Sequence, residues 1–224
     1  EDLIPSAPTP YIEFRRRQFL NFILLMSLSG LRDGEMRSLK WKHWTTVEED
    51  GVLWPKISVV DGKTGNRDAF PLDRSILVVE SQRQLRHDFI GGKYLNEEDY
   101  IFISPSGKRM RTFKDSFEKH CKDAGVSHDI QGRKRVPTSL RHYYATERLL
   151  SADISIDELA AYMGSSAPMI KQHYSDVTNS MIKDRAAGFR NRVAGTYEGF
   201  EPKEVESERE NNMAAVNDRI RRKL

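Results

Sequence analysis

The sequence has very little cysteine, no long apolar run and a small net charge. Cys121 is the only cysteine, so no disulfide can form within the chain, which fits a reducing compartment. The longest apolar stretch, residues 19–28, is interrupted by Asn21 and Ser27 and is shorter than the roughly 20 residues of a membrane helix. The first residues also lack the basic-then-apolar pattern of a secretory signal. We therefore expect a protein that neither spans a membrane nor depends on disulfides.

The charged residues are numerous but nearly balanced. Hydrophobic residues make up 38% of the 224-residue chain and charged residues 31%, a balance typical of a folded globular protein. The formal net charge of +3 is too small to predict nucleic-acid binding by itself. Basic clusters occur at residues 108–111, 133–135 and 219–223, and each alone is typical of a solvated face. DNA binding therefore requires the fold to bring basic groups together.

The spacing of apolar residues predicts a mainly α chain with a small β-hairpin. We expect helices over residues 11–29, 33–39, 74–89, 112–124, 139–150, 155–163, 166–174 and 177–193. Strands over residues 52–60 and 67–72 would pair as the hairpin, with Lys63 near its tip, and residues 100–103 would form a buried edge element. Cys121 follows Phe113 and Phe117 at helical spacing, which favours a packing role over a reactive thiol. No repeat and no metal-ligand cluster is visible in the sequence.

Four short motifs follow one another along the chain. They are SGLRDGEMRSLKW (residues 29–41, with Arg32 and Glu35), GKTG (residues 62–65, with Lys63, followed by Pro71-Leu72), SLRHYYAT (residues 139–146, with Arg141) and MGSS (residues 163–166), with Tyr174 nine residues beyond Ser165. In this order they resemble the two arginine boxes, the lysine hairpin, the later box and the nucleophile of the tyrosine site-specific recombinases, the phage-integrase family. The resemblance runs from about residue 11 to residue 194.

The resemblance implies DNA cleavage and rejoining through a 3′-phosphotyrosine intermediate. Arg32 and Arg141 would clamp the phosphate, because guanidinium groups form paired, charge-assisted hydrogen bonds with its oxygens. Tyr174 would attack phosphorus, and Lys63 would protonate the leaving 5′ oxygen as general acid. Glu35, one turn after Arg32, would orient that arginine. The covalent link conserves the bond, so neither metal nor cofactor is expected.

Two positions depart from the family pattern. Thr138 stands where the family has a histidine three residues before the second arginine, and Ser165 stands where it has histidine or tryptophan. A hydroxyl can donate a hydrogen bond to phosphate but does not exchange a proton near pH 7 as an imidazole does. We therefore expect slow proton transfer to and from Tyr174, with a loss of roughly 10²–10⁴-fold in rate.

Nearby groups are candidates to compensate for these hydroxyls. His173 is the neighbour of Tyr174, and His128, Lys134 and Arg135 lie in the loop before the second arginine box. His142 is expected to pack or cap instead, because adjacent helical residues point about 100° apart and Arg141 takes the inward direction.

The implied fold is the tyrosine recombinase catalytic fold, mainly α with a small β-hairpin or sheet. We expect it over residues 1–198, followed by a polar tail over residues 199–224 that is either a protomer-exchanging helix or disordered. The DNA-gripping domain that precedes it in relatives is expected to be absent from this chain. The implied partners are duplex DNA with inverted recognition arms, further copies of the chain in a tetramer, and accessory DNA-bending proteins. The implied location is the cytoplasm, at the nucleoid of a prokaryote or its phage, with no membrane.

Two other functions share these motifs. A DNA-binding recombinase descendant with impaired or lost cleavage is favoured by Thr138 and Ser165, but opposed by the presence of both arginines, the lysine and the tyrosine. A type IB topoisomerase has the same chemistry without sequence choice, and the wording of the motifs favours the integrase-like family over it.

Overall fold

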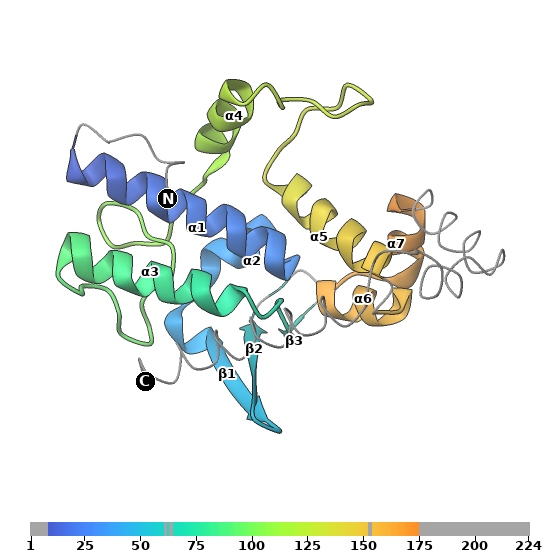
Figure 1. The fold of residues 1–224 in the computed structure, drawn as a ribbon, viewed down its shortest axis with the longest axis horizontal. Helices are drawn as coiled ribbons and strands as arrows, with labels where there is room; N and C mark the ends of the chain where they lie inside the picture. Colours follow the sequence, from blue (N-terminus) through green and yellow to red (C-terminus); the bar gives the residue numbers. More distant parts are fainter. Residues whose placement is uncertain (1–8, 61, 63–64, 152–153, 175–224) are drawn as a thin grey trace, which may run out of the picture.

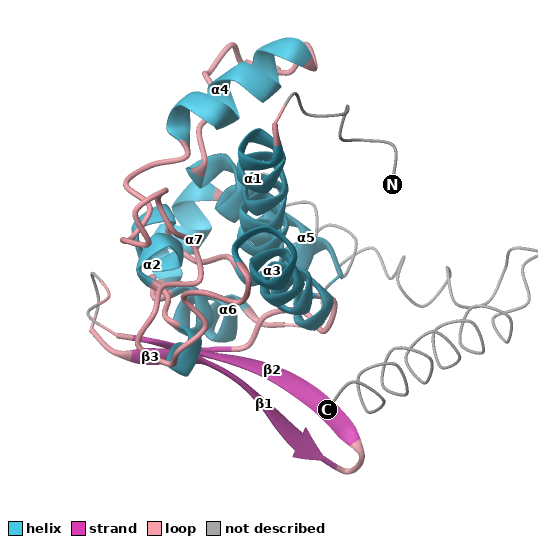
Figure 2. Ribbon diagram, turned by 90° about the vertical axis from the view of Figure 1, so that its left-hand side faces the viewer, coloured by secondary structure: helices cyan, strands magenta, loops and turns pink. Residues whose placement is uncertain are grey.

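The computed structural model describes residues 9–60, 62, 65–151 and 154–174. Within these residues the elements are α1 (Pro10–Ser29), α2 (Asp33–Ser38), the short 3-10 helix η1 (Trp41–His43), β1 (Trp44–Glu49), β2 (Val52–Val59), β3 (Arg67–Ala69), α3 (Ser75–Ile90), α4 (Lys114–Asp123), α5 (Thr138–Ser151), α6 (Ile156–Met163) and α7 (Ala167–His173). The helices α1 and α3 lie side by side, and α5, α6 and α7 form a second group (Figure 1). The sheet runs along one side of the helices (Figure 2).

The predicted helices that fall on described residues are present, with bounds that differ by a few residues at most. Local signals explain several ends: Thr9 caps α1 by accepting a hydrogen bond from the Ile12 N–H, and Ser155 and Glu158 form a capping box at the start of α6. Ser166 caps α7, where its side chain accepts a hydrogen bond from the Met169 N–H. The expected helix over residues 177–193 and the tail over residues 199–224 lie outside the described residues.

Phenylalanines fill the larger core between α1, the 101–103 segment and the start of α4. The Phe22 ring packs on Phe113 with centroids 4.3 Å apart and meets Phe102 edge-on at 5.5 Å. Cys121 is partly buried against this core, and burial raises the pKa of its thiol. The predicted packing role of Cys121 therefore fits its surroundings.

Buried amides fasten the 101–103 segment to α1 and α3. The Gln18 side chain donates to the Ile103 carbonyl and accepts from the Ile103 N–H, both at 3.0 Å. Gln82 on α3 donates to the Ile101 carbonyl at 3.1 Å and accepts from Asn21 at 2.9 Å. These bonds satisfy backbone groups that a helix or sheet would otherwise pair, so the predicted buried edge element is held by side chains.

The sheet contains a strand that the sequence did not predict. The order is β1-β2-β3, with both pairings antiparallel, so the expected β2–β3 hairpin is preceded by a longer β1–β2 hairpin. Asp50 and Gly51, with φ of 51° and 76°, make the turn between β1 and β2. Two consecutive residues at positive φ match the twist of a tight hairpin, and an Asp-Gly pair is a known signal for one. The Asp50-Gly51 pair, together with the β-forming residues of β1 before it, was therefore the sequence signal for this hairpin.

A smaller core joins α5, α6 and α7. Tyr144, Leu149, Leu159, Ile170 and Tyr174 belong to it.

None of the described helices is long and apolar enough to cross a membrane. The described residues also contain no group of three or more His, Cys, Asp or Glu side chains arranged to hold a metal ion.

Candidate active site

Arg141 projects from α5 into the ends of two other helices. Its guanidinium donates to the Gly30 carbonyl at the end of α1 (2.6 Å) and to the Met163 carbonyl at the end of α6 (2.8 Å). The last carbonyls of a helix lack helical partners and carry partial negative charge, so they suit a buried cation. The residue is only 8% exposed, and burial, followed by Arg32, lowers its pKa from 12.5 to about 10. Arg141 therefore stays charged at neutral pH.

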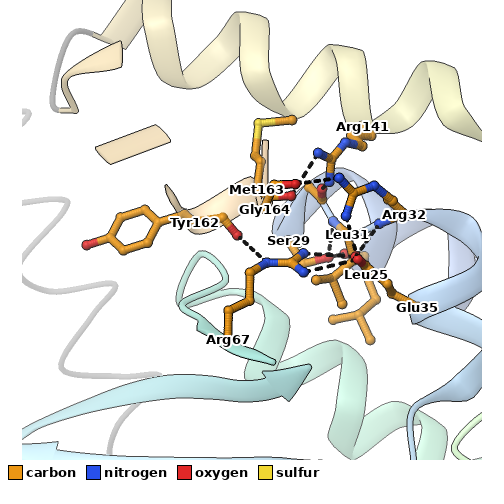
Figure 3. A network of polar contacts seen from close by, with 11 residues as sticks. Leu25, Ser29, Leu31, Arg32, Glu35, Arg67, Arg141, Tyr162, Met163 and Gly164 are labelled. Atoms are coloured by element: carbon orange, nitrogen blue, oxygen red, sulfur yellow. Dashed lines mark hydrogen bonds and ion pairs between the residues drawn. The ribbon is translucent and has the colours of Figure 1, made fainter. Parts of the chain in front are cut away.

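Arg32 lies beside Arg141 although the two are far apart in sequence. It donates to the Gly164 carbonyl, the next one along from the carbonyl that binds Arg141, so both guanidiniums meet the same turn (Figure 3). Its other contact is an ion pair with Glu35, with Arg32 Nη1 and Glu35 Oε1 2.7 Å apart. The sequence prediction that Glu35 orients Arg32 agrees with this geometry.

Glu35 also binds a third arginine, which sequence reasoning missed. Arg67 on β3 makes two hydrogen bonds to the Glu35 carboxylate, of 3.0 and 2.9 Å, and a third to the Tyr162 carbonyl at 3.2 Å. Burial alone would raise the pKa of Glu35, but the hydrogen bonds from Arg67 and Arg32 lower it from 4.5 to about 2. Arg67 and the buried Ala69 are two residues apart and therefore lie on the same face of β3. A charged residue on the inward face of a strand was the sequence signal that could have identified Arg67 as a site residue.

Gly164 allows this close approach. Its φ is +60°, and an added Cβ would lie 2.7 Å from the Arg67 guanidinium carbon. A side chain at this position would therefore be strained by the backbone and would displace Arg67. The glycine of the MGSS motif serves both to end α6 and to admit the arginines.

Tyr174 ends α7 and is buried, with 6% of its surface exposed. Burial raises the pKa of its phenol from 10.0 to about 12, although nearby Arg141 acts in the opposite direction. The phenol oxygen lies 2.8 Å from Nδ1 of His142. A phenol with this pKa is almost fully protonated at pH 7, so its attack on phosphorus requires a proton acceptor.

The expectation that His142 only packs or caps is wrong. Arg141 does point toward the end of α6, but α7 packs on α6 and the residue that ends it, Tyr174, reaches His142. The rings of His142 and Tyr174 are 5.7 Å apart between centroids, and the His173 ring is 6.0 Å from that of His142. The 100° offset between neighbours on a helix therefore gives Arg141 and His142 different partners.

Thr138, Ser165 and Lys63 are the other predicted site residues. Thr138 is the exposed first residue of α5, and Ser165 is half-buried directly after Gly164. Lys63 lies outside the described residues, while Gly62 before it lies close to Glu35. The roles of these three residues remain predictions.

Of the four residues considered as substitutes, Lys134 and Arg135 have side-chain partners away from Tyr174. Lys134 pairs with Glu118 of α4 at 2.9 Å, and Arg135 donates to the Val126 carbonyl at 3.1 Å. His128 is exposed and forms a β-bridge with Lys134. His173 is close to His142 but is exposed at the surface of α7.

The described part of the site carries surplus positive charge. Among the described residues, three guanidinium groups, of Arg32, Arg67 and Arg141, lie around the carboxylate of Glu35. Two of these three charges are left without a carboxylate of this cluster to balance them. Such an arrangement favours binding of an anion next to the phenol of Tyr174.

The fold is similar to those of two solved site-specific recombinases and a transposon integrase. XerH site-specific recombinase bound to its difH substrate in a pre-cleavage complex superposes with a TM-score of 0.57 and 18% identity, over 76% of this chain and 44% of that one. XerA recombinase gives a TM-score of 0.56 and 20% identity, over 83% and 65%. The Tn1549 transposon integrase in complex with transposon right end DNA gives 0.50 and 19%, over 83% and 67%.

These likenesses establish the tyrosine recombinase catalytic fold. The chain spans 44% of the XerH chain and 65% of the XerA chain, and so corresponds to part of their length. Comparison with curated protein sequences found no match. The model of the phage integrase family, however, matches residues 8–181, most of the sequence. With the motifs in order and the fold in agreement, this chain belongs to the phage integrase family.

Proposed function

We propose that this chain cleaves and rejoins DNA at specific sites through a covalent bond between Tyr174 and a 3′ phosphate. The observation that supports this most strongly is the convergence of Arg32 and Arg141 on the consecutive carbonyls of Met163 and Gly164, with positive charge left over beside a buried tyrosine. A phosphodiester supplies the missing negative charge, and attack on phosphorus increases that charge in the transition state.

Each step of the reaction falls to a named group. The two arginines hold the non-bridging oxygens, Tyr174 attacks phosphorus, and the bond to the 5′ oxygen breaks as Lys63 protonates it. Rejoining reverses the step when a 5′ hydroxyl attacks the phosphotyrosine. Glu35 and Arg67 keep Arg32 in place during both steps.

The finer parts of the proposal follow from the family. Residues 1–198 would be the catalytic domain, and the tail over residues 199–224 a helix exchanged between protomers. The partners would be duplex DNA with inverted recognition arms, three further copies of the chain and accessory DNA-bending proteins. The protein would act where such DNA is found, at the nucleoid of a prokaryote or its phage.

The test is trapping of the covalent intermediate. The 224-residue chain is incubated with a pool of nicked duplexes of randomised sequence, and DNA that stays attached to protein in SDS is recovered and sequenced. We expect an adduct that Tyr174→Phe abolishes while DNA binding persists. Tyr143→Phe is the matched control, because that tyrosine is 55% exposed on α5, and it should leave the adduct unchanged. An adduct that persists in Tyr174→Phe refutes the assignment of the nucleophile.

A second candidate function is DNA binding without cleavage. The exposed Thr138 and the half-buried Ser165, in place of the family's proton-transferring side chains, favour it. Binding without adduct at any pH would support this candidate. Relaxation of a supercoiled plasmid without sequence preference would instead point to a topoisomerase.

A further inference from the structure

We propose that His142 accepts the phenolic proton of Tyr174 during cleavage and returns it during rejoining, in place of the imidazoles missing at positions 138 and 165. This inference rests on the proposed function and adds a catalytic residue to it. It starts from one contact, the 2.8 Å separation of His142 Nδ1 and Tyr174 Oη.

The geometry of the pair is set by the packing of α5 and α7 with α6 between them in one core. Tyr174 is fixed at the end of α7, where its N–H donates to the Ile170 carbonyl at 3.0 Å and its ring belongs to the core with α5 and α6. His142 projects from α5 and meets the phenol with the two rings tilted by 49°. A candidate base must lie within hydrogen-bond reach of the proton it removes. His142 meets this condition for the phenolic proton of Tyr174.

The surroundings keep the imidazole neutral and able to accept a proton. Partial burial of the ring lowers the pKa of His142 below 6.5, and His173, Arg141 and Arg133 add to this effect. These groups come from α7, from the same helix and from the preceding loop, and none of them is a carboxylate. At pH 7 the ring is therefore mostly uncharged. Since the residue as a whole is exposed, it also exchanges protons readily with water.

The proton balance of the step is complete with two side chains. The O–H bond of Tyr174 breaks, its proton moves to Nδ1 of His142, and the phenol oxygen bonds to phosphorus. The bond from phosphorus to the 5′ oxygen breaks, and that oxygen takes a proton from Lys63. During rejoining Lys63 recovers its proton from the attacking 5′ hydroxyl, and imidazolium returns its own to the departing phenolate. Neither oxidant nor metal enters the balance.

Cleavage kinetics separate a proton acceptor from a residue that merely holds Tyr174. In single-turnover assays on a duplex recovered from the trapping experiment, His142→Gln should slow cleavage roughly 10²–10⁴-fold at pH 7 with little change in DNA affinity, although glutamine can still accept a hydrogen bond. The loss should shrink as pH rises and hydroxide ionises the phenol. Imidazole added to the buffer should partly restore His142→Ala. His128→Gln, which alters an exposed loop histidine, should keep the wild-type rate.

A second measurement needs no DNA. Nitrogen-15 NMR of the histidine rings reports which nitrogen carries the proton, and the proposal requires His142 to be protonated at Nε2 and bare at Nδ1 above pH 7. A proton on Nδ1 would make Tyr174 the acceptor and would overturn the inference. An unchanged rate and pH profile in His142→Gln, with adduct still forming, would also overturn it while leaving the proposed function intact. Absence of any adduct with the wild-type chain would defeat the proposed function and this inference with it.

Discussion

Replacing Glu35 by glutamine removes a buried carboxylate that lies among guanidinium groups, and its effect on stability can be worked out from the structure. The Glu35 side chain is 6% exposed and pairs with Arg32 and Arg67. These bonds lower its pKa from 4.5 to about 2. At about 1.36 kcal/mol per pKa unit, the ionised carboxylate contributes about 3 kcal/mol to the free energy of unfolding at pH 7. Glu35→Gln should lose about that amount, since it leaves buried cations without their partner.

The sign of the pH dependence follows from the lowered pKa. A carboxylate with a depressed pKa stabilises the fold above its unfolded pKa of 4.5, and the contribution disappears as pH falls toward 2. At pH 3 only about 1 kcal/mol of it should remain. The difference in unfolding free energy between wild type and Glu35→Gln should therefore shrink by about 2 kcal/mol between pH 7 and pH 3. Urea unfolding followed by circular dichroism measures both values.

Glu98 provides the matched control. Hydrogen bonds from Lys40 and Lys42 lower its pKa to about 2 as well, but its side chain is 67% exposed. Solvent screens such pairs, so Glu98→Gln should destabilise the protein far less than Glu35→Gln. Equal losses in the two variants, or a loss in Glu35→Gln that is the same at pH 3 and pH 7, would refute the reasoning.

Two further predictions concern DNA. Binding of the 224-residue chain to duplex DNA should be weak and should fall steeply with salt, with a log–log slope of about −0.9 for each phosphate neutralised; fluorescence anisotropy across a salt series measures it, and tight binding at physiological salt would contradict it. If His142 accepts the proton, Thr138→His should barely change single-turnover cleavage in the wild type but should partly restore His142→Gln, by at most about 10²–10⁴-fold. If Thr138→His raised the cleavage rate more in the wild type than in His142→Gln, the result would contradict the role of His142 as proton acceptor.

The helices could be predicted from the sequence because their signals are local. The apolar spacing of α1, the capping box at Ser155 and Glu158 and the cap at Ser166 all involve residues within one or two turns of each other. Such signals act in the chain before any tertiary contact forms. The strand β1 was missed because its local signal is weak. Apolar and polar residues hardly alternate along it, since most of its residues are exposed. The Asp50-Gly51 turn was its clearest local mark.

The partners of the site residues could not be predicted in the same way. The motifs identified Arg32, Arg141 and Tyr174 through resemblance, and Glu35 through its position one turn after Arg32. They did not indicate that Arg67 would bind Glu35 across the sheet edge.

The contact between His142 and Tyr174 likewise depends on how α5, α6 and α7 pack together. The sequence by itself determined which residue types are present, in what order, and on which side of its own helix each one points. Only the tertiary structure decided which neighbour occupies that side, because a side chain's direction is fixed by its local backbone while its partner comes from a distant segment.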